Sequence, residues 1–478
     1  MLLLAFVGAI AFAGPAAAHT GFESSDPADG AVLDDSVDEI LVTFTGEAAP
    51  TGDGFQVLEA DGTVRQPSEA TSTDDVTWVL RFDPPLAAGT TGVRWMVSAP
   101  DSHPIDGSFS FASGGDAATA APGSEALDTF LATSDDAAMA SRLAGAARML
   151  SMVGALVGVG ALIFAATVLR GHERDIREVM FWVRRAGVVV AVGSLIELAG
   201  QISIDAGGDW SALVSPSAVW TALMTSTGLA IALRLGGGVG LVAGAHPVTL
   251  TATQVPDAVE RVRELVGAGS VAAVGSSPTT PDNSTVDRYG TPEDLAWVPD
   301  AASRGALIGA AALVLSFGFD GHTISKGPWL VTALFTVIHV IAAAAWVGGV
   351  VMLAVVARRR HRFGEPIRAT QLAVRFSVVA TGALAAVGVA GVALAVVILD
   401  NPGELFSTAW GRLLLVKTAI VAAAAIAGGY NHKLLIPELE AHPDDADLAA
   451  HFRRVITAEA GVLVAVGFVT AWLVGAAS

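Results

Sequence analysis

Residues 329–356 read WLVTALFTVIHVIAAAAWVGGVVMLAVV, a run of 28 residues with a single ionisable side chain, His339. About 20 apolar residues are enough for a helix to cross the hydrocarbon core of a bilayer. The run follows Pro328, and proline is well tolerated where a helix begins. The sequence therefore predicts a membrane-spanning helix that begins at Pro328–Trp329.

Similar apolar runs recur along the rest of residues 141–478 and predict an all-α membrane domain of about eight helices. Over the whole chain, 53% of the residues are hydrophobic and 15% are charged, whereas soluble domains carry about 25% charged residues. The chain has no cysteine, which excludes disulfides, thiolate catalysis and iron–sulfur clusters. The other expected helices lie at 142–169, 183–204, 218–245, 304–319, 372–399, 410–430 and 454–475.

Arginines follow the first and the fifth expected helices, which indicates that both loops face the cytoplasm. With eight helices the acidic loops then fall outside, and the multi-pass protein of the plasma membrane has its N-terminal domain outside the cell. Residues 246–300 form a polar cytoplasmic loop, to which we assign no chemistry. The two arginine groups are Arg170, Arg174, Arg177, Arg184 and Arg185, and Arg358, Arg359, Arg360, Arg362 and Arg368.

The net charge of −19 comes entirely from the N-terminal segment, because residues 19–140 carry 22 acidic and three basic residues. Phosphate binding needs a basic patch, so nucleic acid is not an expected partner. The sequence contains no phosphate-binding glycine loop, so a nucleotide is not an expected partner either. The acidic surface and the shortage of lysine suggest a high-salt habitat.

The first 18 residues resemble a secretory signal. Residues 1–13 are apolar, Gly14 and Pro15 break the run, and Ala16 to Ala18 supply a small-residue cleavage site. Cleavage after Ala18 would make His19 the new N-terminus. The alternative is an uncleaved anchor.

Residues 19–112 read as a small β-sandwich of Greek-key type. Four β-rich runs, at 40–44, 54–58, 76–80 and 93–97, are separated by turn sequences and show no helical period. Residues 113–140 are rich in Ala, Gly, Ser and Asp, and we expect them to form a flexible linker.

Three residues of this domain could hold a metal ion. A free His19 would offer its α-amine and its imidazole as a chelate. Asp101 and His103 stand two positions apart, so in a strand both would lie on one face. Nitrogen and oxygen ligands of this kind favour Cu(II). The alternative is that Asp101 caps a turn and His103 lies on the surface. Met96 is the sole methionine between residues 19 and 111, so no thioether site for Cu(I) is expected.

Two segments of this domain resemble the CopC family of copper-binding domains. Residues 19–33, HTGFESSDPADGAVL, are similar to the start of that family, with histidine at the mature N-terminus and an S-x-P-A-x-G segment. Residues 97–111, VSAPDSHPIDGSFSF, resemble its second signature, D-x-H-P followed by G-x-F-x-F. The resemblance implies a β-sandwich that binds copper.

Three later motifs resemble the CopD family of membrane proteins. Residues 339–349, HVIAAAAWVGG, are similar to its H-x6-W-x-G-G helix. Residues 410–417, WGRLLLVK, followed by Tyr430 and Asn431, resemble a second helix, with Trp410 in place of the usual tyrosine, and residues 454–459, RVITAE, resemble the last helix. The resemblance implies a CopC–CopD fusion with a role in copper uptake or resistance.

Ionisable residues within membrane helices are costly and point to function. His339 lies ten residues into its helix, about 15 Å deep, and Trp346 lies two turns further on. His322 and Asp320 precede this helix and would lie at its outer mouth. The remaining intramembrane charges are read first as structural pairs, with a role on a metal or proton path as the alternative: Glu197, Arg234, Lys417 and Glu459.

These observations favour a copper-binding membrane protein, not an enzyme, that captures Cu(II) outside and passes it inward. The expected partners are the copper ion and the lipid bilayer, whereas protein partners stay open. A transmembrane haem or copper oxidoreductase is the alternative in another class, although His339 is the one histidine deep in an expected helix. A copper buffer or sensor without transport is the third.

Overall fold

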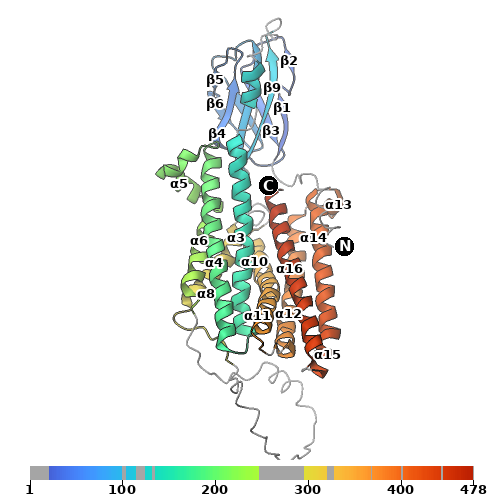
Figure 1. The fold of residues 1–478 in the computed structure, drawn as a ribbon. Coiled ribbons are helices and arrows are strands. Elements are labelled where there is room, and N and C mark those ends of the chain that lie inside the picture. The colour runs from blue at the N-terminus through green and yellow to red at the C-terminus, as the bar shows by residue number, and fades with distance from the viewer. Residues whose placement is uncertain are drawn as a thin grey trace, which may run out of the picture.

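The structure is a computed structural model that describes residues 21–98, 104–114, 124–131, 135–246, 295–319, 328–365, 367, 369–399, 402–407, 409–442 and 445–476. It consists of a β domain at one end of a long helical bundle (Figure 1). The expected signal segment, His19, Asp101, His103, Asp320, His322 and most of the loop 246–300 lie outside the described residues.

The β domain is a sandwich of two sheets, as predicted. One sheet has the order β1-β3-β7-β6 and the other the order β2-β9-β8-β4-β5. The four predicted runs correspond to β3, β4, β7 and β8, although Val76 of the third run precedes β7. The strands are β1 (Phe22–Asp26), β2 (Val32–Leu33), β3 (Glu39–Phe44), β4 (Ala49–Leu58), β5 (Val64–Arg65), β6 (Glu69–Thr71), β7 (Thr77–Arg81), β8 (Gly89–Ser98) and β9 (Pro104–Ser113).

Alternating side chains build the core between the sheets. In β3, Ile40, Val42 and Phe44 point inward and are fully buried, as expected for a strand with one face against a core. The ring of Phe44 packs edge-on against Trp95 of β8, with ring centroids 5.0 Å apart. The period-two pattern of the sequence therefore fixes which face of each strand is buried.

Part of the segment expected as a linker is helical. Helix α2 (Ser124–Leu131) packs on β8 and β9, and α3 (Asp135–Thr167) begins within the same segment. A Cβ at Gly92 would lie 3.2 Å from the ring of Phe130, and the hydroxyl of Ser108 donates to the carbonyl of Leu131 over 2.9 Å. The apolar side of α2 gives this segment a packing partner that composition alone did not indicate.

Helix α3 packs against α4 (Glu173–Asp205), which in turn packs against α6 (Ser226–Gly244), and α6 packs against α8 (Arg304–Ser316). The expected helix 218–245 is interrupted, because α5 (Pro216–Leu223) ends at Leu223 and α6 begins only at Ser226. Thr225 caps α6 by accepting a hydrogen bond from the backbone N–H of Gly228. The short 3-10 segments η2 (Trp210–Val214) and η3 (Phe317–Phe319) flank these helices.

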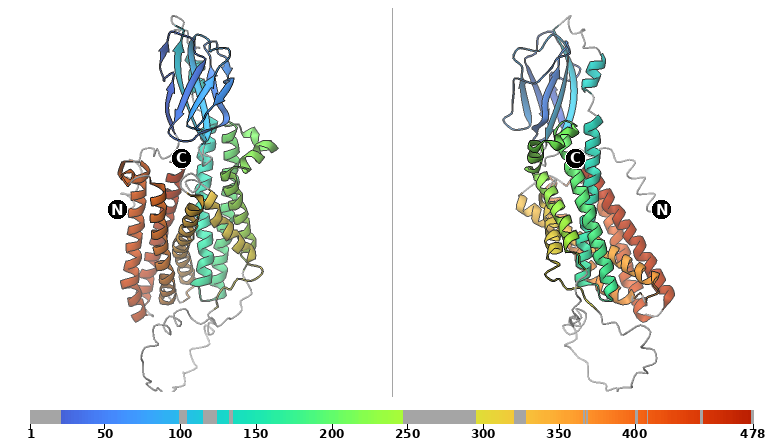
Figure 2. Two further views of the ribbon diagram at one scale, coloured as in Figure 1. Left: turned by 180° about the vertical axis from the view of Figure 1, so that it is seen from behind. Right: turned by 60° about the vertical axis from the view of Figure 1, so that its left-hand side comes forward.

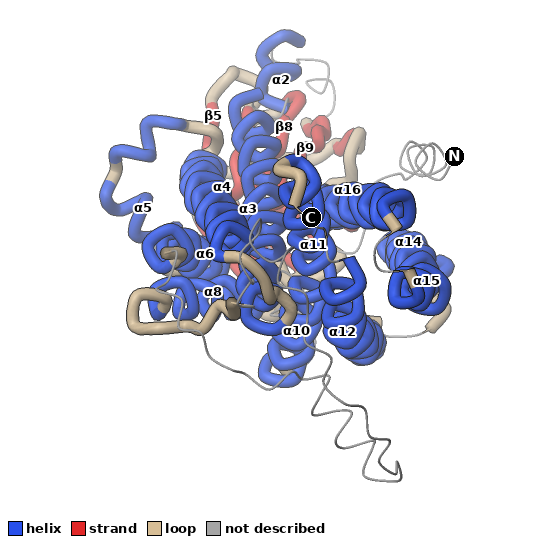
Figure 3. Tube along the Cα trace, turned by 60° about the horizontal axis from the view of Figure 1, so that its bottom comes forward, coloured by secondary structure: helices blue, strands red, loops and turns tan. Residues whose placement is uncertain are grey.

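The expected helix at Trp329 begins where the sequence predicts and continues as α10 (Trp329–Ala343), the π-helical turn η4 (Ala344–Gly348) and α11 (Gly349–Arg362). The last helices lie beside it, with α14 and α15 at the margin of the bundle (Figures 2 and 3). They are α12 (Ala369–Ile398), α13 (Glu404–Ser407), α14 (Ala409–Tyr430), the π-helical turn η5 (Asn431–Leu435), α15 (Ile436–Ala441) and α16 (Ala446–Ala476).

Six helices of the described residues are long and apolar enough to cross a membrane. The expected segment at 304–319 is shorter, and α16 coincides with the last expected segment. The predicted number of about eight is roughly compatible with this arrangement. The six are Met139–Thr167, Glu173–Asp205, Ser226–Gly244, Trp329–Arg362, Gln371–Val397 and Leu414–Ala441.

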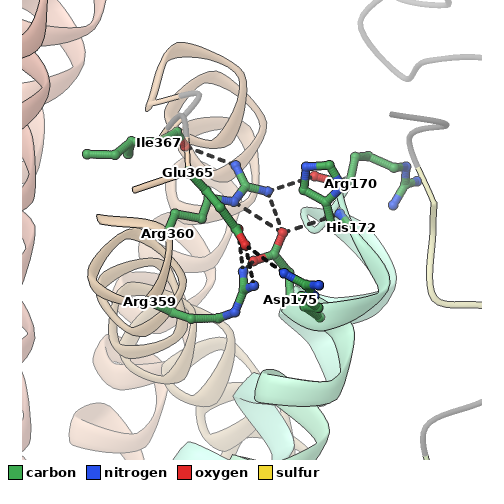
Figure 4. Close-up of polar contacts among 8 residues, drawn as sticks. Arg170, His172, Asp175, Arg359, Arg360, Glu365 and Ile367 are labelled. Atoms are coloured by element: carbon green, nitrogen blue, oxygen red, sulfur yellow. Dashed lines mark hydrogen bonds and ion pairs between the residues drawn. The ribbon is translucent and has the colours of Figure 1, made fainter. Parts of the chain in front are cut away.

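An ion-pair cluster joins α4 to α11 (Figure 4). The start of α4 and the end of α11 lie at the end of the bundle opposite the β domain (Figure 1). Arg360 donates to Asp175 from Nη2 over 2.8 Å and from Nε over 3.1 Å, and Arg359 donates to the other oxygen of Asp175. Arg359 also pairs with Glu365 at 2.9 Å. The expectation that Arg359 and Arg360 are loop charges is wrong for both, because each lies in α11 and is buried against Asp175.

Candidate functional site

The strand ends next to the expected copper ligands in the sequence lie together at one end of the sandwich. Gly21, two positions after His19, exchanges hydrogen bonds of 2.8 Å with Thr45 through its N–H and its carbonyl. Ala49 pairs with Ser98 between β4 and β8, and Ser98 pairs with Pro104 between β8 and β9. Ser98 and Pro104, which flank the segment with Asp101 and His103 in the sequence, thus lie side by side at this end.

Aromatic packing holds β1 against these strands. The ring of Phe22 stacks on Trp95, with centroids 5.9 Å apart, and on Phe109, with centroids 5.8 Å apart. Gly107 leaves the space that the Trp95 ring occupies, because a Cβ at residue 107 would overlap the indole.

This end of the sandwich faces the helices. A carboxylate oxygen of Asp53 in β4 lies 3.4 Å from the position of a Cβ on Gly207, just beyond the end of α4. Asp53 also lies 3.8 Å from the guanidinium of Arg94. Nearby, Asp209 accepts hydrogen bonds from Ser211, 2.6 Å from its hydroxyl and 2.8 Å from its backbone N–H, and these bonds hold the pKa of Asp209 below its ordinary value.

His339 projects from α10 toward α12. Its Cε1 lies 3.5 Å from the position of a Cβ on Gly391, an ordinary contact distance, so the imidazole packs directly against α12. The Nδ1 atom is buried and has no hydrogen-bond partner among the described residues. Lys417 of α14 lies within electrostatic reach of the ring. His339 thus keeps a nitrogen lone pair or N–H available inside the bundle.

A cavity of about 170 Å³ lies further along the same helix, between η4 and α11 on one side and α12, η5 and α16 on the other. Its walls are mostly apolar and include Trp346. Its polar groups come from α12, η5 and α16: Asn431 donates from Nδ2 to Glu459 Oε2 over 3.0 Å, and Ser377 Oγ lies 2.6 Å from His432 Nδ1. Trp346 and His339 therefore both face α12, at different depths.

The other intramembrane charges form a buried group of their own. Glu197 Oε1 accepts from Arg148 Nε over 2.8 Å and from Arg234 Nη2 over 3.1 Å. Sequence reasoning considered Arg234 but missed Arg148, which comes from α3 and is 49 positions away from Glu197. Glu459 contacts Asn431 rather than a basic partner, and Lys417 makes no ion pair with any other described residue.

Residues 22–114 match the family model of the CopC domain, and residues 370–473 match the model of CopD, copper resistance protein D. The chain is a CopC–CopD fusion. The CopD match covers α12, α14 and α16, which form three walls of the cavity, and it does not extend to α10 with His339. The protein is a multi-pass membrane protein with the β domain and the helical domain in the predicted order.

Two curated proteins are similar to parts of this fusion. The copper transport protein CutJ of Bacillus subtilis (strain 168) is 28% identical over 122 residues, which are 26% of this chain and 23% of CutJ. The inner membrane protein YebZ of Escherichia coli (strain K12) is 32% identical over 149 residues, which are 29% of this chain and 48% of YebZ. The chain thus matches less than half of the length of either relative.

Solved structures resemble the β domain. CopC from Methylosinus trichosporium OB3b is 21% identical with a TM-score of 0.18, over 20% of this chain and 93% of that protein. PcoC, a methionine-rich copper resistance protein from Escherichia coli, is 23% identical with a TM-score of 0.17, over 20% of this chain and 98% of that protein.

Proposed function

We propose that this fusion captures Cu(II) on its β domain outside the cell and passes copper inward across the membrane. The observation that carries the proposal is the presence of a CopC domain and a CopD region in one chain. The described strand ends add to it, because they bring the attachments of residues 19, 101 and 103 to the end of the sandwich that faces the helices. Capture would thus take place next to the membrane.

The capture site in this proposal consists of the His19 amine and imidazole, Asp101 and His103. A metal ion can displace the proton of a terminal amine at neutral pH, because the ordinary pKa of that amine is about 7.7–8.0. Three nitrogens and a carboxylate oxygen suit the tetragonal geometry of Cu(II). Such a site depends on the cleavage that frees the His19 amine.

The orientation in this proposal follows from the distribution of basic residues. The pairing of Asp175 with Arg360 places the start of α4 and the end of α11 at the same end of the bundle. Exposed arginines gather there, among them Arg174 and Arg177, and positive charge favours the cytoplasmic side. The β domain, at the opposite end, would then lie outside the cell.

The path in this proposal runs from the β domain past Asp320 and His322 to His339. A neutral imidazole binds either valence of copper, and His339 has an unpartnered Nδ1 inside the bundle. The ring lies against Gly391 of α12, which adds no side chain beside it. His339 is therefore the residue on which passage through the membrane should depend most.

Copper accumulation in cells tests the proposal. We expect His339→Ala to abolish accumulation while Cu(II) binding by the β domain stays normal, and His322→Ala to reduce accumulation less, because Asp320 and water can replace it in part. His442→Ala, at an exposed histidine of the opposite end, serves as the control for loss of an imidazole. Full accumulation with His339→Ala would contradict the proposed path. A Soret band in the purified wild-type protein would show bound haem and favour the oxidoreductase alternative.

A further inference from the structure

The cavity lies where two helices of the bundle carry π-helical turns. Trp346 belongs to η4, and Asn431 and His432 belong to η5. A π-turn interrupts the regular hydrogen bonding of a helix and is found frequently at functional sites. Two such turns on facing walls of one cavity indicate that the irregular backbone serves the cavity and not helix packing alone.

Two oxygen atoms at this cavity lack hydrogen-bond donors among the described residues. Asn431 is 8% exposed, and its Oδ1 is buried without a partner. Its Nδ2 donates to Glu459 Oε2 over 3.0 Å, which holds the carboxylate in place, and Glu459 Oε1 lies near Gly428 with no hydrogen-bond donor among the described residues. A polar atom buried as Asn431 Oδ1 is costs free energy unless something binds it.

A nitrogen atom completes the set. His432 lines the cavity, and its Nδ1 lies 2.6 Å from Ser377 Oγ. When Nδ1–H donates to Ser377, the lone pair of Nε2 is free. Histidines that bind metals use their second ring nitrogen in this manner, because the second hydrogen bond fixes the tautomer and the orientation of the ring.

We propose that this cavity is a transient binding site for a divalent transition-metal ion, with Glu459 Oε1, Asn431 Oδ1 and His432 as its protein ligands. The inference rests on the proposed function in naming copper as the ion: along α10 and η4 the cavity begins about 10 Å beyond His339, at 1.5 Å per residue. A cation would also neutralise a carboxylate that faces mostly apolar walls and has no basic partner among the described residues.

The donor set predicts weak binding, which suits a site on a path. Three protein ligands leave coordination positions to water, and about 170 Å³ is room for several water molecules. Conduction requires a site that binds well enough to be entered and weakly enough to be left. The cavity therefore fits an ion in transit better than a permanently bound cofactor.

Cu(II) binding by the full-length protein in lipid nanodiscs tests the inference. His103→Ala first weakens the β-domain site, and calorimetry and electron paramagnetic resonance then measure the remaining Cu(II). We expect one weaker Cu(II) per chain, bound at least about tenfold more weakly after Glu459→Gln, which is about 1.4 kcal/mol. The matched control Glu440→Gln removes an exposed carboxylate of α15 and should leave binding unchanged.

A gain of affinity provides a second measurement that misfolding cannot imitate. Asn431→Asp places a second carboxylate beside Glu459, and we expect it to tighten Cu(II) binding by about tenfold. No gain with Asn431→Asp, or unchanged binding with Glu459→Gln, would overturn the inference. If wild-type protein shows only the weak site that depends on Glu459, the proposed capture by the β domain fails while this inference stands.

Discussion

The two halves of the helical bundle are built differently. We call α3, α4, α6 and α8 the first half, and α12, α14, η5, α15 and α16 the second half. The apolar stretches of α3 and α4 are 61% and 56% buried, whereas those of α12 and α14 are 17% and 11% buried. Figure 3 shows the reason, since α3 lies centrally and α14 lies at the margin. The first half is a packed core, and the second half has few covering helices.

Their polar groups differ in the same sense. In the first half Glu197 is paired with Arg148 and Arg234, and Asp175 is paired with Arg359 and Arg360 across to α11. In the second half the polar side chains face a cavity with open positions, such as Asn431 Oδ1. The comparison teaches that buried charge pairs hold the first half together, whereas in the second half the polar groups border the cavity that we propose as an ion site.

The largest expected effect comes from the glycine contact that joins α3 to η4. A Cβ at Gly160 would overlap the carbonyl oxygen of Ala344, and backbone atoms cannot move aside as a side chain can. We expect Gly160→Val to prevent folding, so that size-exclusion chromatography yields no monodisperse protein. Gly382→Val in α12, where a Cβ meets no atom within 4 Å, is the matched control and should fold. If both variants folded, or neither did, the contrast between a tightly packed first half and a loosely covered second half would be wrong.

The next effect concerns the buried ion pairs. Asp175→Asn would leave Arg359 and Arg360 buried without their counter-charge, which costs about 3–5 kcal/mol. Thermal unfolding in detergent should show a clear loss of stability. Glu173→Gln in the same helix turn removes an exposed pair with Arg177, for which about 0–1 kcal/mol is expected. A loss for Asp175→Asn no larger than that of the control would show that the cluster does not hold α4 to α11.

A smaller effect on folding, but a large one on transport, is expected where the cavity is filled. Ala380→Leu adds a side chain to the cavity wall, and because there is space it should leave the unfolding temperature unchanged or raise it. Copper accumulation should fall by at least about tenfold. Ala385→Leu on the exposed side of α12 should alter neither quantity. Normal accumulation with Ala380→Leu would separate the cavity from the path.

The smallest expected effect is on the pH dependence of stability, and it comes from an exposed carboxylate that accepts several hydrogen bonds. In the β domain Asp74 Oδ1 accepts from the backbone N–H groups of Thr77 and Val76, each over 3.0 Å, and these bonds lower the pKa of Asp74 from 3.8. Because the folded pKa is lower than the unfolded one, the stabilisation is present above about pH 4 and is lost as the pH falls through the folded pKa. Asp74→Asn should lack this part of the acid sensitivity. Identical unfolding curves of the two proteins from pH 7 to pH 3 would contradict it.

Much of the fold could be predicted because its signals are local. The alternation in β3 and the apolar run after Pro328 each specify an element within a few residues of chain. Arg359 and Arg360 show the limit, since they read as cytoplasmic loop charges and yet are buried against a carboxylate about 185 positions away. Helix α4 likewise begins ten residues before its apolar run, because its charged first turns include Asp175, which this pairing buries.

The sequence by itself determined a β-sandwich followed by membrane helices, the CopC and CopD motifs, and the residue types that suit Cu(II). Hydrophobic period and short motifs depend on neighbours in the chain, so they are readable without the fold. Only the tertiary structure decided that Arg148 joins Arg234 at Glu197, and that Asn431 and Glu459 meet at a cavity beside Trp346. These contacts depend on the rotation and crossing of separate helices, which are set by packing and not by local sequence.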